Sequence, residues 1–430
     1  MLKQLFSIFK IPELRKRILF TLGALAIFRA GTHIPIPGID PEMLQAMFEG
    51  GGGNILQYLN MFTGGALGRG TLFGLGITPY INASIITSLL TAVVPKLKEL
   101  QQQGRQGRKV ITKYTRYGTL AIALIQSFGW SYFLVQQGVV RDASILFYLT
   151  AVVSMTTGTV FLMWLGERIT ENGIGNGISV IIMAGILARM PGNLISTWVT
   201  INANNKEIWG IILILVFVVV IAGVVIIQQG RRKITIQYAK RTAGKKVYGG
   251  QTGHLPIKVN QGGVIPIIFS SVLLSLPMTV VQWVPQLGWL QQWVQRGSVP
   301  YLVTYCLLIV FFTYFYSAII FDPRDVAKNL KESGGFIPGV RPGESTVQYI
   351  ESILNRLLLV GALFLAGIAV LPHLISAISG LTAFWLGGTS VLIVVGVGID
   401  ILMQIESHMV MRHYDSLTES GAASLLGRRK

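Results

Sequence analysis

The stretch IWGIILILVFVVVIAGVVII, residues 208–227, decides the fold class because it contains no charged side chain. About 20 apolar residues in an α-helix are enough to cross a hydrocarbon core of about 30 Å. The rest of the chain has the same character, since 51% of its 430 residues are hydrophobic and only 13% are charged. A water-soluble surface needs more charge than this, so the composition predicts a polytopic membrane protein.

Apolar runs of similar length recur along the chain and predict an all-α fold with ten transmembrane helices. The predicted spans are residues 18–36, 71–94, 117–137, 146–166, 178–200, 208–229, 264–284, 301–321, 353–371 and 389–411. Ten spans divide into two sets of five, and because five is odd the second set must be inverted relative to the first. We therefore expect an N-terminal half of residues 1–200 and a C-terminal half of residues 201–430, with a path between them.

Basic residues are distributed unevenly along the chain, whose formal net charge is +18. The N-terminal tail, the loops after spans two, four, six and eight, and the C-terminal tail all lie on one side of the predicted membrane. Together they hold 30 of the 36 Lys and Arg residues. Since Lys and Arg are retained on the cytoplasmic side, we expect both termini in the cytoplasm. This orientation explains the basic composition without a nucleic-acid partner.

Two of the cytoplasmic loops, residues 230–263 and 322–352, are long. The first has no acidic residue and a hairpin pattern, with a strand at Lys233–Tyr238, a turn at Ala243–Gly244 and a return strand at Lys245–Tyr248. Such loops either set orientation and contact anionic lipid, or they bind a partner. The residues expected to contact a partner are Lys240, Arg241, Lys245, Lys246 and Arg341, the last placed before a Pro-Gly turn.

The sequence contains no pattern typical of a membrane enzyme. His-Glu-x-x-His is absent, the five histidines have no metal-ligand spacing, and Cys306 is the single cysteine. We therefore expect no catalytic activity, no metal site and no cofactor. An alternative is a small-solute secondary transporter with an inverted repeat, but the charged residues deep in the predicted spans are few: Arg29, Arg189, Asp400 and Glu406.

Two predicted spans carry polar side chains at helical spacing. Small residues often mediate helix packing, and two such stripes also fit helices that face each other across a polar path. The stripe of the second span comprises Ser84, Thr87, Ser88 and Thr91, and that of the seventh comprises Ser271, Ser275 and Thr279. The second span also holds Gly74, Gly76 and Pro79, so we expect irregular backbone at its outer end.

The segment at residues 54–67 is apolar but too short to cross the membrane, and it follows a glycine run at residues 50–53. It is either an interfacial helix or a re-entrant stopper of the path.

Several stretches resemble the SecY/Sec-alpha translocon family, in the order in which the family has them and over essentially the whole chain. They are FRAGTHIPIPGID (28–40), NMFTGGAL (60–67), YTRYG (114–118), MWLGE (163–167), GIGNGIS (173–179), HLPIKVN (254–260), FIPGVRPGE (336–344) and GGTS (387–390). The resemblance implies two inverted five-helix halves around a central, hourglass-shaped pore in the inner, cytoplasmic membrane. It implies a protein-conducting channel for unfolded, signal-bearing polypeptides that also releases hydrophobic segments sideways into membrane lipid. The implied partners are small subunits similar to SecE and SecG, the SecA ATPase and the translating ribosome.

The resemblance also assigns roles to residues of this sequence. The pore ring comprises Ile77, Ile81, Ile178, Ile182, Ile268 and Ile393. The plug is the segment 54–67, with the apolar residues Ile55, Leu56, Leu59, Met61, Phe62 and Leu67. The lateral gate lies between the second and seventh spans, near Asn82 and Leu276 and along the two polar stripes. The long basic loops match the surface on which SecA and the ribosome bind.

The charge asymmetry predicts which loops face the cytoplasm. Single cysteines at positions 245 and 341, in a Cys306→Ser background, should not react with an impermeant thiol reagent added to intact cells. A cysteine at position 141, in a short loop of the opposite side, should react and serves as the control. Labelling at 245 or 341 from outside would reject the predicted orientation.

Overall fold

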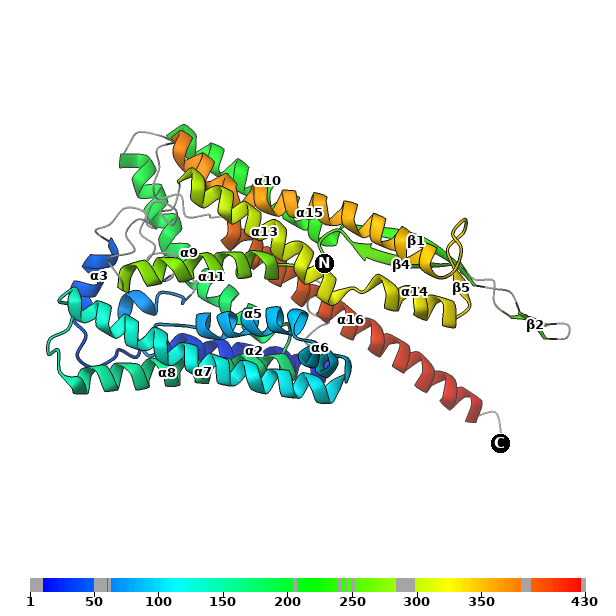
Figure 1. Cartoon of the computed structure of the whole chain (residues 1–430), viewed down its shortest axis with the longest axis horizontal. Coiled ribbons are helices and arrows are strands. Elements are labelled where there is room, and N and C mark those ends of the chain that lie inside the picture. Colours follow the sequence, from blue (N-terminus) through cyan, green and yellow to red (C-terminus); the bar gives the residue numbers. More distant parts are fainter. Residues whose placement is uncertain are drawn as a thin grey trace. The chain divides into compact units, whose positions relative to one another are not determined.

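The computed structural model describes residues 11–49, 60, 63–203, 207–238, 241–243, 246–248, 252–283, 298–379 and 388–426. The chain divides into two compact units. Unit 1 comprises residues 1–195, 282–285 and 393–430, and unit 2 comprises residues 196–281 and 286–392. Helices dominate both units (Figure 1).

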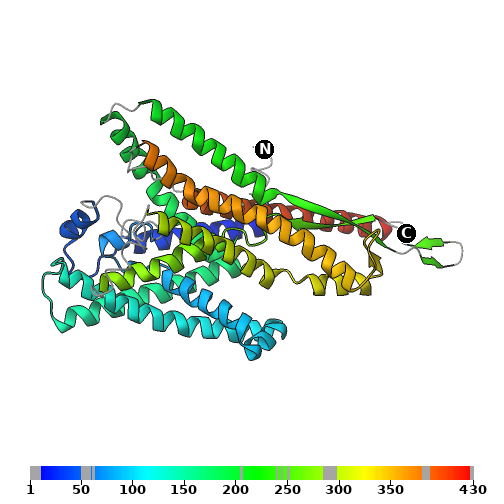
Figure 2. The ribbon, with the colours of Figure 1, turned by 45° about the horizontal axis from the view of Figure 1, so that its top comes forward.

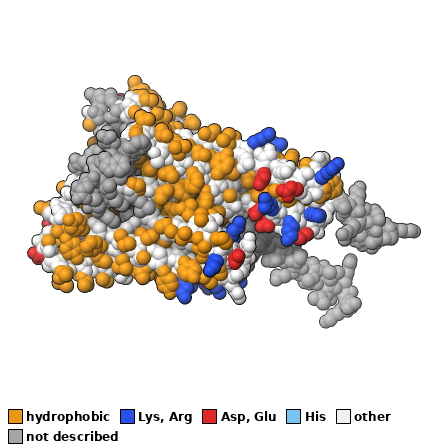
Figure 3. Space-filling model, in the orientation of Figure 1, with side chains coloured by type: hydrophobic (Ala, Val, Ile, Leu, Met, Phe, Trp, Pro, Cys, Tyr) orange, Lys and Arg blue, Asp and Glu red, His pale blue; other side chains and the backbone are white. Residues whose placement is uncertain are grey.

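Each of the ten predicted spans overlaps one helix. The helices are α2 (Pro12–Gly31), α5 (Thr78–Val93), α7 (Arg105–Gln136), α8 (Ile145–Asn172), α9 (Gly177–Ala203), α10 (Glu207–Gln229), α11 (Ile265–Trp283), α13 (Val299–Ile320), α15 (Glu344–Ser379) and α16 (Gly388–Leu426). Within the described residues, 7 helices are long and apolar enough to span a membrane, or 8 if α5 and the helix after it form one bent span. Hydrophobic side chains cover much of the visible surface, whereas Lys and Arg gather around α14 (Pro323–Glu332) (Figure 3).

Helix α10 shows why the surface is apolar. Ile208, Ile211 and Ile214 are 74%, 72% and 64% exposed, although the whole helix carries a single charged residue, Glu207. Exposed isoleucines at this density are unfavourable in water and favourable against lipid. The helix therefore presents a lipid-facing side, as residues 208–227 predicted.

The core of unit 1 lies where α7 and α8 pack against the segment after α2. Helix α2 ends at Gly31 rather than at the predicted residue 36, because Pro35 and Pro37 cannot continue a helix. The extended segment that follows binds the backbone before α5: Leu72 N–H donates to the Ile34 carbonyl at 3.0 Å, and Ile36 N–H donates to the Gly70 carbonyl at 2.9 Å. The short helix α3 (Pro41–Glu49) covers the same region.

Helix α5 begins at Thr78, seven residues later than the predicted span, which agrees with irregular backbone at its outer end. Gly76 adopts φ +57°, a left-handed conformation that favours glycine. At its other end α5 stops at Val93, because Pro95 forces Val94 into an extended conformation (φ −90°, ψ 113°). The next helix, α6 (Pro95–Gln102), leaves at 99° to α5.

The basic loop of unit 2 forms a sheet whose pairing differs from the predicted hairpin. Strand β1 (Arg231–Tyr238) pairs antiparallel with β4 (Thr252–Lys258), and not with the predicted return strand at 245–248. That stretch instead pairs locally, as β3 (Lys246–Tyr248) with β2 (Arg241–Ala243). Figure 2 shows this small pair beyond the ends of β1 and β4. The prediction of the return strand was wrong because the short alternating run fits either partner.

The second long loop contributes the third strand of this sheet. Strand β5 (Gly335–Phe336) pairs with the end of β1, which gives the strand order β4-β1-β5. The Tyr238 ring explains the glycine in β5, since a Cβ on Gly335 would lie 3.0 Å from Tyr238 Cε1. Beneath the sheet, Ile234, Ile257 and Ile337 pack against α15 in one buried cluster. The two long loops are thus one folded substructure of unit 2.

The residues before α5 lie close to α8, and this contact predicts that Gly158 and Gly23 differ in how well they tolerate alanine. A Cβ on Gly158 of α8 would overlap the carbonyl oxygen of Leu72, whereas a Cβ on Gly23 of α2 meets no heavy atom within 4 Å. Gly158→Ala should lower the free energy of unfolding by about 1–3 kcal/mol, seen as a lower melting temperature in detergent. Gly23→Ala should change it by less than about 0.5 kcal/mol. Equal melting temperatures for the two variants would contradict the close approach.

Candidate functional site

Hydrogen bonds around Asn60 hold the described end of the predicted plug. Gly65 N–H donates to the Asn60 carbonyl at 2.8 Å, and Gly68 N–H donates to Asn60 Oδ1 at 2.9 Å. The Thr63 hydroxyl donates to the Asn60 carbonyl at 3.1 Å and accepts from Leu67 N–H at 3.2 Å. Asn60 is 4% exposed. These bonds replace the helical ladder for residues 63–68, so this non-helical stretch is held in one conformation.

Most of the apolar plug residues lie outside the described residues: Ile55, Leu56, Leu59, Met61 and Phe62. Leu67, the last of them, is 3% exposed and begins the 3₁₀ turn η1 (Leu67–Arg69). Its side chain belongs to a buried cluster with Leu44, Trp130 and Phe147. The end of the plug is therefore anchored in the core of unit 1.

The described end of the predicted plug, residues 60 and 63–67, which we call the plug base, touches the start of α5. A Cβ on Gly76 would lie 2.9 Å from Thr63 Cγ2, so Thr63 sits directly over the backbone of Gly76. The next residue, Ile77, is the N-cap of α5, and Ile81 lies one turn further on. Both isoleucines are buried. Ile77 and Ile81, two of the predicted ring residues, thus come directly after Gly76, the residue that Thr63 contacts.

The other predicted ring residues are placed on three helices. Ile178 and Ile182 lie in the first turns of α9, where Asn176 Oδ1 accepts from the Ile178 backbone N–H at 3.1 Å. Ile182 and Ile393 are fully buried, and Ile178 is half-buried. These residues belong to unit 1, as Ile77 and Ile81 do, whereas the buried Ile268 of α11 belongs to unit 2. The closure of a six-membered ring stays a prediction.

The polar stripe of α5 bonds to its own helix. The Thr87 hydroxyl donates to the Ala83 carbonyl, and the Thr91 hydroxyl donates to the Ser88 carbonyl, each at 2.8 Å. Ser84, Thr87 and Ser88 are half-buried, and Thr91 is buried. These two threonine hydroxyls donate to carbonyls of α5 itself, so they are not needed to hold α5 to a neighbouring helix.

Asn82 is the exception on α5. Its side chain is 2% exposed, and both amide atoms lack a hydrogen-bond partner among the residues that the structure describes. An unpaired buried amide costs about 1–3 kcal/mol. The side chain stands one residue after Ile81, at the level of the predicted ring.

On α11 the predicted gate is described only in its first half. Ser271 is buried and donates its hydroxyl to the Ile268 carbonyl at 2.8 Å. Ser275, Leu276 and Thr279 lie in α11, but their side chains are outside the described residues. The facing of the two stripes stays a prediction.

The predicted docking residues lie on the substructure formed by the two loops. Arg341 is exposed on a turn between Gly339 (φ +82°) and Gly343 (φ +113°), and its carbonyl accepts from the Thr346 hydroxyl at 2.9 Å. Arg241 and Lys246 lie at opposite ends of the β2–β3 pair, whereas Lys240 and Lys245 are outside the described residues. The structure therefore supports the predicted rigid turn at Arg341.

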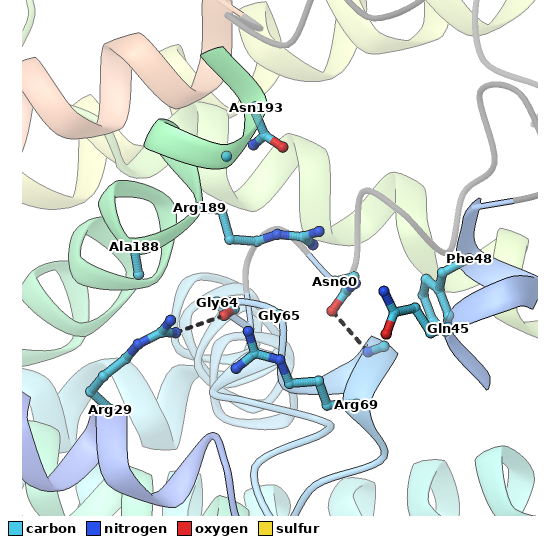
Figure 4. Close-up of a pocket in the computed structure, with 12 residues that line it drawn as sticks. Arg29, Gln45, Phe48, Asn60, Gly64, Gly65, Arg69, Ala188, Arg189 and Asn193 are labelled. Atoms are coloured by element: carbon cyan, nitrogen blue, oxygen red, sulfur yellow. Dashed lines mark hydrogen bonds between the residues drawn. The ribbon is translucent and has the colours of Figure 1, made fainter. Parts of the chain in front are cut away.

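The structure also reveals a pocket that sequence reasoning missed. Three arginines of unit 1, Arg29, Arg69 and Arg189, line a cavity of about 350 Å³ beside Gly64 and Gly65 of the plug base (Figure 4). In the sequence they are only three of the six basic residues left on the outer side. Their separation along the chain gives no sign that they meet.

Comparisons with known proteins agree on one family. The family model described as SecY matches residues 71–402. Protein translocase subunit SecY of Thermotoga maritima is similar at 47% identity over 430 residues, which covers 98% of each chain. A solved structure described as "The structure of a protein conducting channel" has a TM-score of 0.68 at 18% identity, over 94% of this chain and 96% of that one. Another, "Sec61 in the Canine ribosome-channel complex from the endoplasmic reticulum", has a TM-score of 0.65 at 17% identity over the same shares.

The hydrogen bonds of Asn60 generate a test of the plug base. Asn60→Ala should leave Gly68 N–H buried without its acceptor, which costs about 1–3 kcal/mol and should loosen residues 60–68. The resting protein in planar bilayers should then conduct ions more than the parent protein. Asn60→Asp keeps an acceptor oxygen and should leak less than Asn60→Ala. Equal, parent-like conductance of both variants would show that this base does not hold a seal.

Proposed function

This chain belongs to the SecY family, and from that premise we propose how its residues pass an unfolded polypeptide across the membrane and release hydrophobic segments into it. The protein is a protein-conducting channel and not an enzyme. Membership of the family also removes the alternative of a small-solute transporter. The proposal concerns the waist, the gate and the docking surface.

The observation that carries the proposal is the seat of Thr63 on Gly76, directly before Ile77. Residues 63–68 are fixed by hydrogen bonds to Asn60 and to one another, so this end of the plug lies at the level where α5 begins. We assign the waist of the pore to this level, with Ile77, Ile81 and the other four isoleucines as its ring. A narrow apolar neck resists water and ions because it dewets. Isoleucine side chains form no hydrogen bonds with the passing polypeptide, so the neck can widen around any sequence.

The gate follows from what lipid requires of a polypeptide. A hydrophobic segment must leave the pore sideways, because polar backbone left unsatisfied in hydrocarbon costs several kcal/mol per group. Two helices must therefore part repeatedly, and their contact must be weak. The threonines of α5 bond to their own helix, and interhelical Ser/Thr bonds in membranes average only about 0.6 kcal/mol. We place the gate between α5 and α11, with the unpaired amide of Asn82 as a site of weak cohesion in the resting state.

The cytoplasmic drive is proposed to act on the sheet of unit 2. Strand β5 pairs with β1, so the loop of Arg341 and the β1–β4 part of the other basic loop form one sheet, and the β2–β3 pair extends from the same loop. Exposed basic side chains contribute little to stability but much to partner recognition. We propose that this surface is cytoplasmic, as are both termini, and that it contacts SecA or a translating ribosome, while small subunits similar to SecE and SecG complete the channel. The solved ribosome-bound relative supports a partner of this kind.

A disulfide across the gate tests the proposal. Cysteines at positions 82 and 276, in a Cys306→Ser background, should join in the resting channel, and oxidation should block export of a signal-bearing substrate until a reductant is added. Tyr80 lies two residues before Asn82, on the opposite face of α5, so a cysteine there, combined with one at 276, should not cross-link and provides the matched control. Complete disulfide formation with undiminished export and membrane insertion would exclude α5 and α11 as the gate.

A further inference from the structure

Three guanidinium groups from separate parts of unit 1 converge on one pocket. Arg29 extends from the last turn of α2, Arg69 from η1 and Arg189 from α9, and all three point toward the space beside Gly64 and Gly65 (Figure 4). The cavity measures about 350 Å³. Among the described residues that line it, none is acidic.

The arginines of this pocket have no acidic partner among the described residues. Three other arginines of unit 1 pair with a carboxylate, for example Arg116 with Glu167 at 2.8 Å and Arg168 with Glu171 at 3.0 Å. In the pocket, Arg29 Nη1 donates to the Gly64 carbonyl at 3.2 Å, and Arg69 Nη1 lies 2.7 Å from His33 Nε2. Neither partner is an acid. The three positive charges therefore stand together without a counter-charge in the part of the chain that the structure describes.

Of the three arginines, Arg189 most clearly needs a hydrogen-bond acceptor. Its Nη1 atom is buried and has no hydrogen-bond partner among the described residues. A buried charged donor without an acceptor is costly, more so than a neutral one. Two like charges beside it add repulsion. An acceptor that carries negative charge would satisfy the donor and relieve the repulsion at once.

The backbone of the plug base leaves room for such an acceptor. Gly64 and Gly65 adopt φ +67° and +91°, which keeps side chains out of this wall of the pocket. A Cβ on Gly65 would lie 3.7 Å from Arg189 Cδ, and a Cβ on Gly64 would lie 3.1 Å from Gly185 Cα. Gly64 and Gly65 thus lie close to α9, and all three arginines still line the cavity.

We propose that this pocket binds a phosphate-type oxyanion. Arginine presents a planar fork of donors that matches the oxygens of phosphate in a bidentate manner, and three forks around one space can satisfy several oxygens together. The cavity exceeds the size of inorganic phosphate, so the phosphodiester of a lipid headgroup fits the same chemistry. The bound anion bridges α2, η1 and α9, and therefore fastens the plug base to the two helices beside it.

The experiment is isothermal titration calorimetry on the purified full chain with its copurifying subunits, at constant ionic strength in chloride. The probes are inorganic phosphate, dihexanoylphosphatidylglycerol and dihexanoylphosphatidylcholine below their micelle-forming concentrations. Arg189→Gln should weaken binding at least about tenfold, since it removes charge-assisted bonds. Arg69→Gln is an exposed second variant, so a loss of affinity there does not depend on folding of the buried position. Arg141→Gln removes one charge from a side chain that is 72% exposed, outside the pocket, and should leave the affinity unchanged.

The outcomes separate the sources of the anion. Phosphatidylglycerol bound at least tenfold more tightly than inorganic phosphate, with the same dependence on Arg69 and Arg189, identifies a lipid headgroup; equal or weaker binding identifies free phosphate. No binding of any probe, or binding that both arginine variants retain, overturns the proposal. Binding that appears only after Glu49→Gln also overturns it, because a carboxylate of the chain itself would then be the natural occupant. The gate disulfide is independent of all these results.

Discussion

Backbone amides at membrane depth must find partners inside the protein, and this constraint governs the channel more than any side chain does. The ten helices satisfy it with their own ladders. Residues 63–77 cannot, because glycines and positive φ angles break the helix there. The chain meets the requirement instead with Asn60, the Thr63 hydroxyl and the extended residues after α2. A non-helical segment can therefore persist directly before α5.

The basic loops fold together although this constraint does not act on them. Outside the membrane a loop can bond to water, so nothing obliges it to form a sheet. Here β5 adds a third strand to β1, and Ile234 and Ile337 cover the buried face on α15. In the proposed function this surface receives force from a partner and has to transmit it to the helices without unfolding. A sheet packed on the long helix α15 meets that requirement better than two separate loops.

The sequence predicts the local features well and the distant ones poorly. Continuous apolar runs identify all ten helices, and Pro35, Pro37 and Pro95 explain where α2 and α5 end. The pairing of β1 with β4 could not be chosen over the return strand at 245–248, because short alternating runs carry little register information. The seat of Thr63 on Gly76 and the meeting of Arg29, Arg69 and Arg189 depend on the tertiary fold alone. The ring and gate residues come from resemblance to a family, since one isoleucine or serine in a membrane helix looks like any other.

The hydrogen bonds of unit 1 separate what must stay fixed from what must move. At the plug base they join residues far apart in sequence, as from Arg29 to Gly64 and from Leu72 to Ile34. On α5 the threonine hydroxyls bond only within their own helix turn. Bonds between distant segments break when those segments separate, whereas bonds inside one helix survive its displacement. Moving the plug base as a whole therefore breaks hydrogen bonds. Helix α5, by contrast, can shift against a neighbour and keep its threonine hydrogen bonds. A channel that must seal at rest and open sideways needs both properties within one helix and the segment that leads into it.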